Sequence, residues 1–174
     1  LHCPYEADKA KLVVREMTDL LVLDLVDKGL VTDQMVLTVG YDVENLTDPA
    51  RRARYHGPVE TDRYGRRIPK QAHGSINLDS HTSSTKKIMC AVSELFDRIV
   101  DRNLLVRRMY VVANHVLPEA DAPKKNDGAV QLDLFTDYAA QEEKQKAEDA
   151  ALERERKLQK AALAIKKKYG KNAI

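Results

Sequence analysis

Apolar residues recur at helical spacing in two segments of the chain. The first segment, residues 8–29, starts at Asp8 as a candidate cap and stops at Gly29, which predicts an amphipathic helix. The second, about residues 83–102, follows Thr82 and Ser83, either of which can cap a helix. The apolar stripes are Val14, Met17, Leu21 and Leu25 in the first helix, and Ile88, Val92, Leu95, Phe96 and Ile99 in the second.

Three further segments alternate apolar and polar residues, as strands with one buried face do. They span residues 34–43, 73–80 and about 104–116, and a short strand at Leu1–Pro4 completes the order β-α-β-β-α-β. We therefore predict an α+β fold of the ferredoxin-like type over residues 1–116. It has a four-stranded antiparallel sheet with two helices on one face and the other face open. The alternation assigns these residues to the helix side: Met35, Leu37, Val39, Tyr41, Ile76, Leu78, Met109, Val111 and Ala113.

The chain changes character after Val116. Residues 117–130 are polar and contain Pro and Gly, which predicts a flexible linker. Residues 136–174 form a tail dominated by Ala, Glu, Lys, Arg and Gln, in which we predict a charged helix that is marginal when isolated. The short apolar stripe of this helix consists of Leu158, Ala162, Ile165 and Tyr169.

Between linker and tail lies a short apolar island, residues 131–135. Two leucines and a phenylalanine in five residues are too few for a core and too apolar for a spacer. We interpret the island as a docking peptide whose apolar side chains fill a groove on a partner. Two alternatives stay open: the island folds back onto its own domain, or it starts the following helix. Its residues are Gln131, Leu132, Asp133, Leu134 and Phe135.

Composition narrows the class of protein. The chain has 174 residues, with 29 Lys and Arg against 27 Asp and Glu, so its net charge of +2 does not by itself indicate a polyanionic partner. Cys3 and Cys90 have neither the number nor the spacing of a disulfide framework or zinc site, which favours a reducing, cytoplasmic compartment. No apolar run approaches membrane-spanning length, so no membrane partner is expected. Because the chain begins at Leu1 without a Met or a signal-peptide pattern, we expect a fragment of a longer protein.

Local charge departs from the overall balance. Residues 46–70 carry a local excess of four positive charges, including Arg66 and Arg67, and Arg107 and Arg108 lie on the last predicted strand. Cations beside small or polar residues on an open sheet face predict sequence-independent contact with a nucleic-acid backbone. The alternative is a solvated basic loop with surface arginines. The other candidate contacts are Thr38, Ser75 and Asn77 on the open face, and Lys86 and Lys87 in the first turn of the second helix.

No catalytic or metal-binding constellation emerges from the sequence. The five histidines are scattered without helical or hairpin metal spacing, and the chain has neither a phosphate-cradling Gly-rich loop nor a nucleophile elbow. We therefore expect no catalytic residue, no metal site and no cofactor in this part of the protein.

Five segments taken together resemble one family. The segments KLVVREM, VLTVGYD, HGSINL, HTSSTKKI and LVRRMYVVANH are similar to the little-finger domain of Y-family translesion DNA polymerases. The likeness is greatest to the UmuC-like branch found in Gram-positive bacteria. QLDLF is similar at every position to the family's motif for binding the β sliding clamp.

The resemblance implies a DNA repair role in the SOS response to DNA damage, with the domain docked in the major groove of primer-template DNA. It implies three partners: primer-template DNA, the β sliding clamp and the N-terminal polymerase core of the same protein. Nucleotidyl transfer and its Mg²⁺ belong to a palm domain expected before Leu1, so this part binds DNA in the bacterial nucleoid without polymerising. Arg107 and Arg108 match paired basic residues that face DNA in the family. The family's polar helix start is matched by Ser83, Ser84, Thr85 and Lys86.

Overall fold

A computed structural model describes residues 1–123 and 138–170, apart from the side chains of 138–145 and 148. The helices are α1 (Ala7–Lys28), α2 (Glu44–Thr47), α3 (Pro49–Arg54), α4 (Thr85–Ile99), α5 (Tyr138–Tyr169) and the 3₁₀ turn η1 (Glu119–Asp121). The strands are β1 (Leu30–Tyr41), β2 (Val59–Thr61), β3 (Arg67–Pro69), β4 (Ala72–Thr82), β5 (Val106–Asn114) and β6 (Leu117–Pro118). The apolar island at 131–135 lies outside the described residues.

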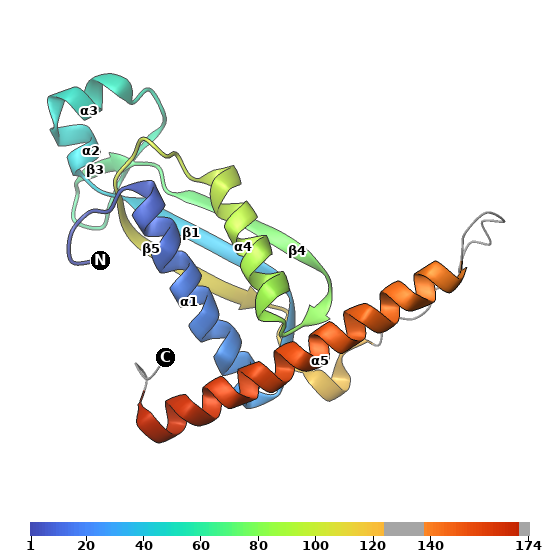
Figure 1. Ribbon diagram of the computed structural model, residues 1–174. Helices are drawn as coiled ribbons and strands as arrows, with labels where there is room; N and C mark the ends of the chain where they lie inside the picture. The colour runs from blue at the N-terminus through green and yellow to red at the C-terminus, as the bar shows by residue number, and fades with distance from the viewer. Residues whose placement is uncertain (124–137, 171–174) are drawn as a thin grey trace.

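The main sheet has four antiparallel strands, with β1 between β4 and β5 and with β6 paired to the first residues of β1. Helices α1 and α4 lie side by side on one face of this sheet, and no helix within residues 1–123 or 138–170 covers the other face (Figure 1). The predicted α+β fold, with two helices on one face of a four-stranded sheet, is therefore confirmed. Pairing of β6 extends the sheet two residues beyond Val116, and η1 follows it directly. The flexible linker predicted over 117–130 is therefore wrong for residues 117–121, because β6 pairs with β1 and Glu119 N donates to Gly29 O.

The strand predicted at Leu1–Pro4 does not form. Only Tyr5 pairs, through a single bridge in which Tyr5 N and Val106 N donate to each other's carbonyl oxygen at 2.9 and 2.8 Å. Pro4 has no N–H to donate to a ladder, and α1 begins at Ala7, so little chain is left to pair. The fourth strand of the sheet is β6 instead.

The core lies between the sheet and the two helices. Met35, Leu37 and Val39 of β1 are fully buried, as the alternation predicts, and they pack with Val14 of α1 and Phe96 of α4. Each such side chain contributes about 1.5–3 kcal/mol of burial free energy. The core thus fixes which face of the sheet stays open to solvent.

The helix ends differ in part from the predicted caps. Gly29 ends α1 at φ +65°, as expected for a left-handed stop, but Asp8 lies in the first turn and Glu6 takes the cap position. Ser84 caps α4, rather than Thr82 or Ser83, because the Thr82 hydroxyl accepts the Ser84 N–H and turns the Ser84 side chain toward the helix. The Ser84 hydroxyl then accepts the N–H of Lys87 at 3.3 Å.

The long connection at 46–70 is ordered. It folds into α2, α3 and the antiparallel β2–β3 hairpin, which lie at the end of the domain near the N-terminus (Figure 1). Asn45 holds this module in place, because its buried side chain bonds to the backbone of Asp42 and Leu105.

Helix α5 forms as predicted and crosses the opposite end of the domain, against α1 and the start of α4 (Figure 1). Most of the predicted apolar stripe does not make this contact, and of its four residues only Ala162 is half-buried. Leu158 and Tyr169 are 71% and 68% exposed, whereas Gln159 is buried. Hydrogen bonds from the polar side of the helix decide which face docks. The spacing of apolar residues carries no information about such hydrogen bonds, so it could not predict the docked face.

Candidate nucleic-acid interface

The open face of the sheet carries short rows of small and polar side chains. Strand register places Gln34 between Asn77 and Asn114, Val36 between Ser75 and Val112, and Thr38 between His73 and Tyr110. A fourth row pairs Gly40 with Arg108. The predicted open-face residues Thr38, Ser75, Asn77 and Arg108 therefore do share one surface, and none of the residues in these rows is acidic.

Amide side chains cross the three strands as a hydrogen-bonded ladder. The Gln34 Nε2 donates to Asn77 Oδ1 at 2.8 Å, and Asn114 Nδ2 donates to Gln34 Oε1 at 2.9 Å. One row on, Thr38 Oγ1 lies 2.8 Å from His73 Nδ1. These bonds join polar side chains of neighbouring strands along the open face.

The arginine end of this face depends on a glycine. A Cβ at Gly40 would lie 2.7 Å from Cγ of Arg108, so only glycine lets the Arg108 stem cross β1. A register shift between Gly40 and Tyr41 puts Arg107 in a bulge beside Arg108. Arg107 lies 3.6 Å from the carboxylate of Asp42, whereas Arg108 has no hydrogen-bond or ion-pair partner among the described residues.

The β2–β3 hairpin adds a third cation to this end. Arg66 lines a hollow together with Arg107 and Arg108, and the carboxylates of Asp42, Glu44 and Asp62 also border it. Asp62 pairs with Arg66 and Asp42 lies beside Arg107, so Arg108 is the arginine of this hollow that has no partner among the described residues. Arg67, on β3, is exposed. Arg66 and Arg107 are some forty residues apart in the sequence, so no local pattern predicts that they lie near each other. They do so because the 46–70 connection folds back toward β5.

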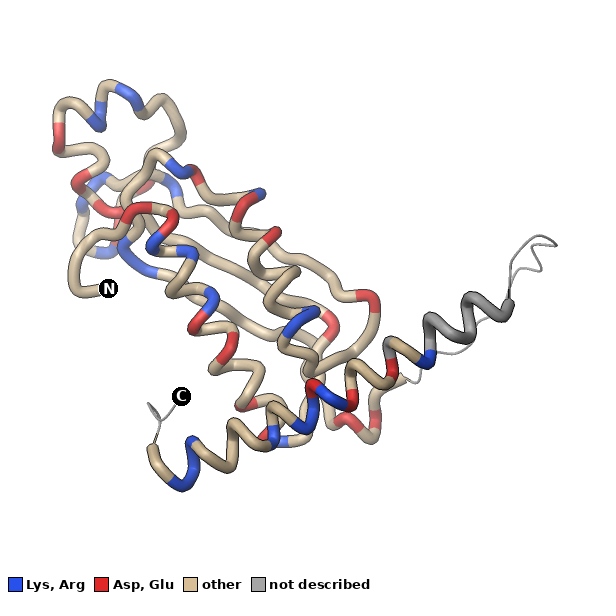
Figure 2. The backbone as a smooth tube through the Cα atoms, viewed as in Figure 1, with Lys and Arg blue, Asp and Glu red and all other residues tan. Residues whose placement is uncertain are grey.

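Charge is distributed unevenly along the molecule. In Figure 2, Lys and Arg alternate with Asp and Glu at the end of the domain that carries α3 and β3, whereas the middle of β1 and β4 carries neither. The cations are therefore at the edge of the polar surface and not spread across it.

The predicted contacts at the start of α4 lie elsewhere, under α5. Glu155 accepts the Ser84 hydroxyl at 2.7 Å and the Lys86 backbone N–H at 2.8 Å. Gln159 donates to the Ser83 carbonyl at 2.9 Å and to the Thr85 hydroxyl at 2.8 Å. With α5 docked, a carboxylate of the chain itself occupies the anion position at this helix start. These residues, with neighbouring Lys87, therefore do not join the open-face surface.

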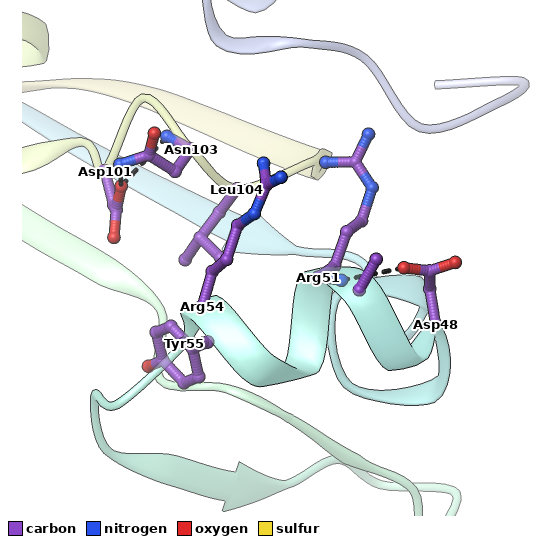
Figure 3. Close-up of a pocket in the computed structure, with 8 residues that line it drawn as sticks. Asp48, Arg51, Arg54, Tyr55, Asp101, Asn103 and Leu104 are labelled. Carbon is purple, nitrogen blue, oxygen red and sulfur yellow. Dashed lines mark hydrogen bonds between the residues drawn. The ribbon is translucent and has the colours of Figure 1, made fainter.

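Another hollow lies on the far side of α3. Figure 3 shows Arg51 and Arg54 extending from α3 beside Leu104, with Asp101 and Asn103 across from them. Asp48 caps α3 by accepting the Arg51 N–H at 2.7 Å. Two arginines are balanced by the carboxylates of Asp48 and Asp101, so this hollow does not select an anion by charge.

The described residues offer neither a metal site nor a membrane span. They contain no group of three or more His, Cys, Asp or Glu side chains placed to hold a metal ion. No helix among them is long and apolar enough to cross a membrane. Cys3 and Cys90 are exposed free thiols.

Several residues that shape this end of the domain or dock α5 were not predicted from the sequence. Asn45, Glu155 and Gln159 act through contacts that are distant along the chain, so no local pattern marks them. Asp62 and Gly65 do carry a local signal, since Asp at the first position and Gly at the fourth are typical of a type I turn.

Comparison with known proteins identifies one family. Residues 4–134 match the C-terminal domain of the impB/mucB/samB family. Searches of curated proteins and of solved structures found no match. The match does not test the Gram-positive branch, which stays a prediction. It covers three quarters of the chain, including every strand of the main sheet. The chain therefore belongs to the impB/mucB/samB family, and it contains the C-terminal domain of a UmuC-like, Y-family polymerase.

Proposed function

We propose that this domain holds primer-template duplex on the open face of its sheet through contacts with the phosphate backbone. The parent protein is then an error-prone, Mg²⁺-dependent DNA polymerase whose catalytic core lies outside this chain. The proposed contacts are Arg107, Arg108, Arg66 and Arg67 at the cationic end, and Thr38, Ser75 and Asn77 across the sheet.

One observation carries the proposal. The rows from Gly40 to Gln34 hold no carboxylate, they combine polar side chains with Val36, Tyr110 and Val112, and they end at Arg108, whose guanidinium has no described partner. An uncharged surface with a cation at its end suits a phosphate backbone, which needs positive charge but no base-specific groups.

Salt dependence tests this proposal. Duplex affinity of the full chain is measured by fluorescence anisotropy between about 50 and 200 mM salt, where counterion release makes log K fall linearly with log salt. Arg107→Ala and Arg108→Ala should each weaken binding by similar factors for all duplex sequences and reduce the salt slope by about 1. Affinity that stays flat as salt rises would refute phosphate tracking.

Arg15→Ala is the matched control. Arg15 is an exposed arginine on α1, on the helix side of the sheet, so this variant removes the same charge from the opposite face. An equal loss of affinity in Arg15→Ala and Arg108→Ala would show that total charge matters and the open face does not.

We also propose that residues 131–135 bind the β sliding clamp, with the segment between η1 and residue 131 as the connecting linker. Two weak attachments on one DNA molecule reinforce each other by effective concentration. Capture of the full chain by immobilised clamp should disappear in the double variant Leu134→Ala, Phe135→Ala and persist in Arg107→Ala. If the clamp captures the double variant as well as wild type, residues 131–135 are not the clamp-binding segment.

A second candidate function is a non-catalytic interaction domain in DNA repair without direct DNA contact. The open face favours it in one respect: Tyr110 and Val112 are 52% and 46% exposed, and with Val36 they form an apolar strip that suits a protein surface. On this alternative, Tyr110→Ala weakens partner binding, and the arginine variants leave duplex affinity unchanged.

A further inference from the structure

The tip of the β2–β3 hairpin, residues 62–66, is a rigid turn built around one carboxylate. Asp62 N donates to Arg66 O at 2.9 Å, and Gly65 N donates to Asp62 O at 3.0 Å. The Asp62 side chain closes the turn from inside, because its Oδ1 accepts the backbone N–H groups of Tyr64 and Arg66, both at 2.9 Å. Gly65 supplies the left-handed position at φ +77°.

The same carboxylate fixes the direction of Arg66. Its Oδ2 accepts from Arg66 Nε at 2.9 Å and lies 2.7 Å from Nη2, a two-point contact that orients the planar guanidinium. Burial acts to raise the pKa of Asp62, but hydrogen bonds from Arg66 outweigh it and hold that pKa below its ordinary value of 3.8. Asp62 is therefore ionised, and the turn is preorganised, at neutral pH.

The turn presents one aromatic side chain between two cations. Tyr64 is 64% exposed and takes no part in the core. The guanidinium carbons of Arg63 and Arg66 lie 4.6 and 5.3 Å from the centroid of its ring, and the Tyr64 hydroxyl also accepts a hydrogen bond from Arg63. An aromatic ring among arginines is the combination with which proteins stack unpaired bases.

The tip is continuous with the proposed DNA surface. Arg66 belongs both to the tip and to the hollow that Arg107 and Arg108 line. Tyr64 lies beside Arg66, so it is within reach of a strand that leaves a duplex held at those arginines. Bases inside a duplex stack on each other and hide their faces, so a ring at this position can stack only on an unpaired base.

We propose that Tyr64, held by the 62–66 turn, stacks on an unpaired base of single-stranded DNA next to the duplex bound on the open face. The proposal rests on the proposed function, and it adds a single-strand site to a duplex site. Every base has a π face, so stacking tolerates any base. The site therefore distinguishes single-stranded from double-stranded DNA and does not select a sequence.

The test compares blunt duplex with the same duplex carrying an overhang of about five nucleotides, at either end of the strand, by fluorescence anisotropy with the full chain. The wild-type chain should bind one overhang substrate more tightly than blunt duplex. Tyr64→Ala should lower overhang affinity about tenfold, in the lower half of the range for loss of one stacked base, and leave blunt-duplex affinity unchanged. Tyr64→Phe, which keeps the ring, should bind like wild type.

Two variants sharpen the result. Tyr169 is a matched control, since it is 68% exposed and also has a lysine near its ring, Lys168 at 5.1 Å, but lies on α5. Tyr169→Ala should change neither affinity. Asp62→Ala keeps the ring but removes the carboxylate that closes the turn, and it should lower the affinity for the overhang substrate as Tyr64→Ala does.

Equal wild-type affinity for blunt and overhang substrates would overturn the stacking site, as would a Tyr64→Ala loss of the same size on both. Failure of the wild-type chain to bind blunt duplex would count against the proposed function instead. In that case, the affinity of wild type and Tyr64→Ala for a single-stranded oligonucleotide alone still decides the stacking site.

Discussion

Replacing Asn45 by alanine should destabilise the domain more than any other single polar truncation at the arginine end. Asn45 is fully buried. Its Nδ2 donates to the carbonyl oxygens of Asp42 and Leu105, both at 2.9 Å, and its Oδ1 accepts the Leu105 N–H at 2.8 Å. One side chain thus joins the segment after β1 to the segment before β5, which carries Arg107 and Arg108.

The size of the effect follows from what each partner loses. Both carbonyl oxygens keep a second donor, since Asp42 N donates to Leu105 O and Asn45 N donates to Asp42 O. Loss of the two hydrogen bonds from Asn45 Nδ2 therefore costs about 1 kcal/mol in total. The Leu105 N–H loses its only described partner in a buried position, which costs about 1–3 kcal/mol. We expect a total loss near 3 kcal/mol in the free energy of unfolding.

Urea unfolding measures this loss. With a denaturant slope of about 2 kcal/mol per molar, the midpoint should fall by about 1.5 M while the slope itself stays unchanged. Asn103→Ala is the control, because Asn103 is exposed and should cost no more than about 0.5 kcal/mol. A loss below about 1 kcal/mol for Asn45→Ala, or an equal loss for both variants, would refute the reasoning.

Three further predictions use the same domain. Gly40→Ala should lower duplex affinity and leave the melting temperature within a few degrees of wild type, because the new Cβ displaces the Arg108 stem and not the core; an unchanged affinity would contradict this. Glu155→Ala should speed hydrogen exchange at the first turn of α4 and proteolysis within α5, whereas Glu153→Ala, on the same helix but exposed, should change neither. A hydrogen bond from Lys11 on α1 holds the pKa of Asp97 below its ordinary value of 3.8. The Asp97 carboxylate therefore stabilises the fold above pH 3.8, and this stabilisation is lost as the pH falls through the folded-state pKa. Unfolding midpoints of Asp97→Asn should therefore fall less than those of wild type as the pH drops below about 4.

Local periodicity was sufficient for much of the domain. Alternation placed Met35, Leu37 and Val39 on the buried face and Thr38 and Arg108 on the open one, and the structure agrees. The alternation could do this because a strand sends successive side chains to opposite faces wherever it pairs. The helical stripes of α1 and α4 were equally local, since residues three and four apart share one face of any helix.

Other features were decided only in the tertiary structure. The central position of β1, the meeting of Arg66 with Arg107 and Arg108, and the docking of α5 through Glu155 all join residues distant along the chain. The sequence offers many partners for each such contact. Which contact forms depends on the pairing register, on loop folding and on where buried groups find hydrogen-bond partners. The sequence by itself therefore determined which faces this domain has, and only packing decided which residues meet on them.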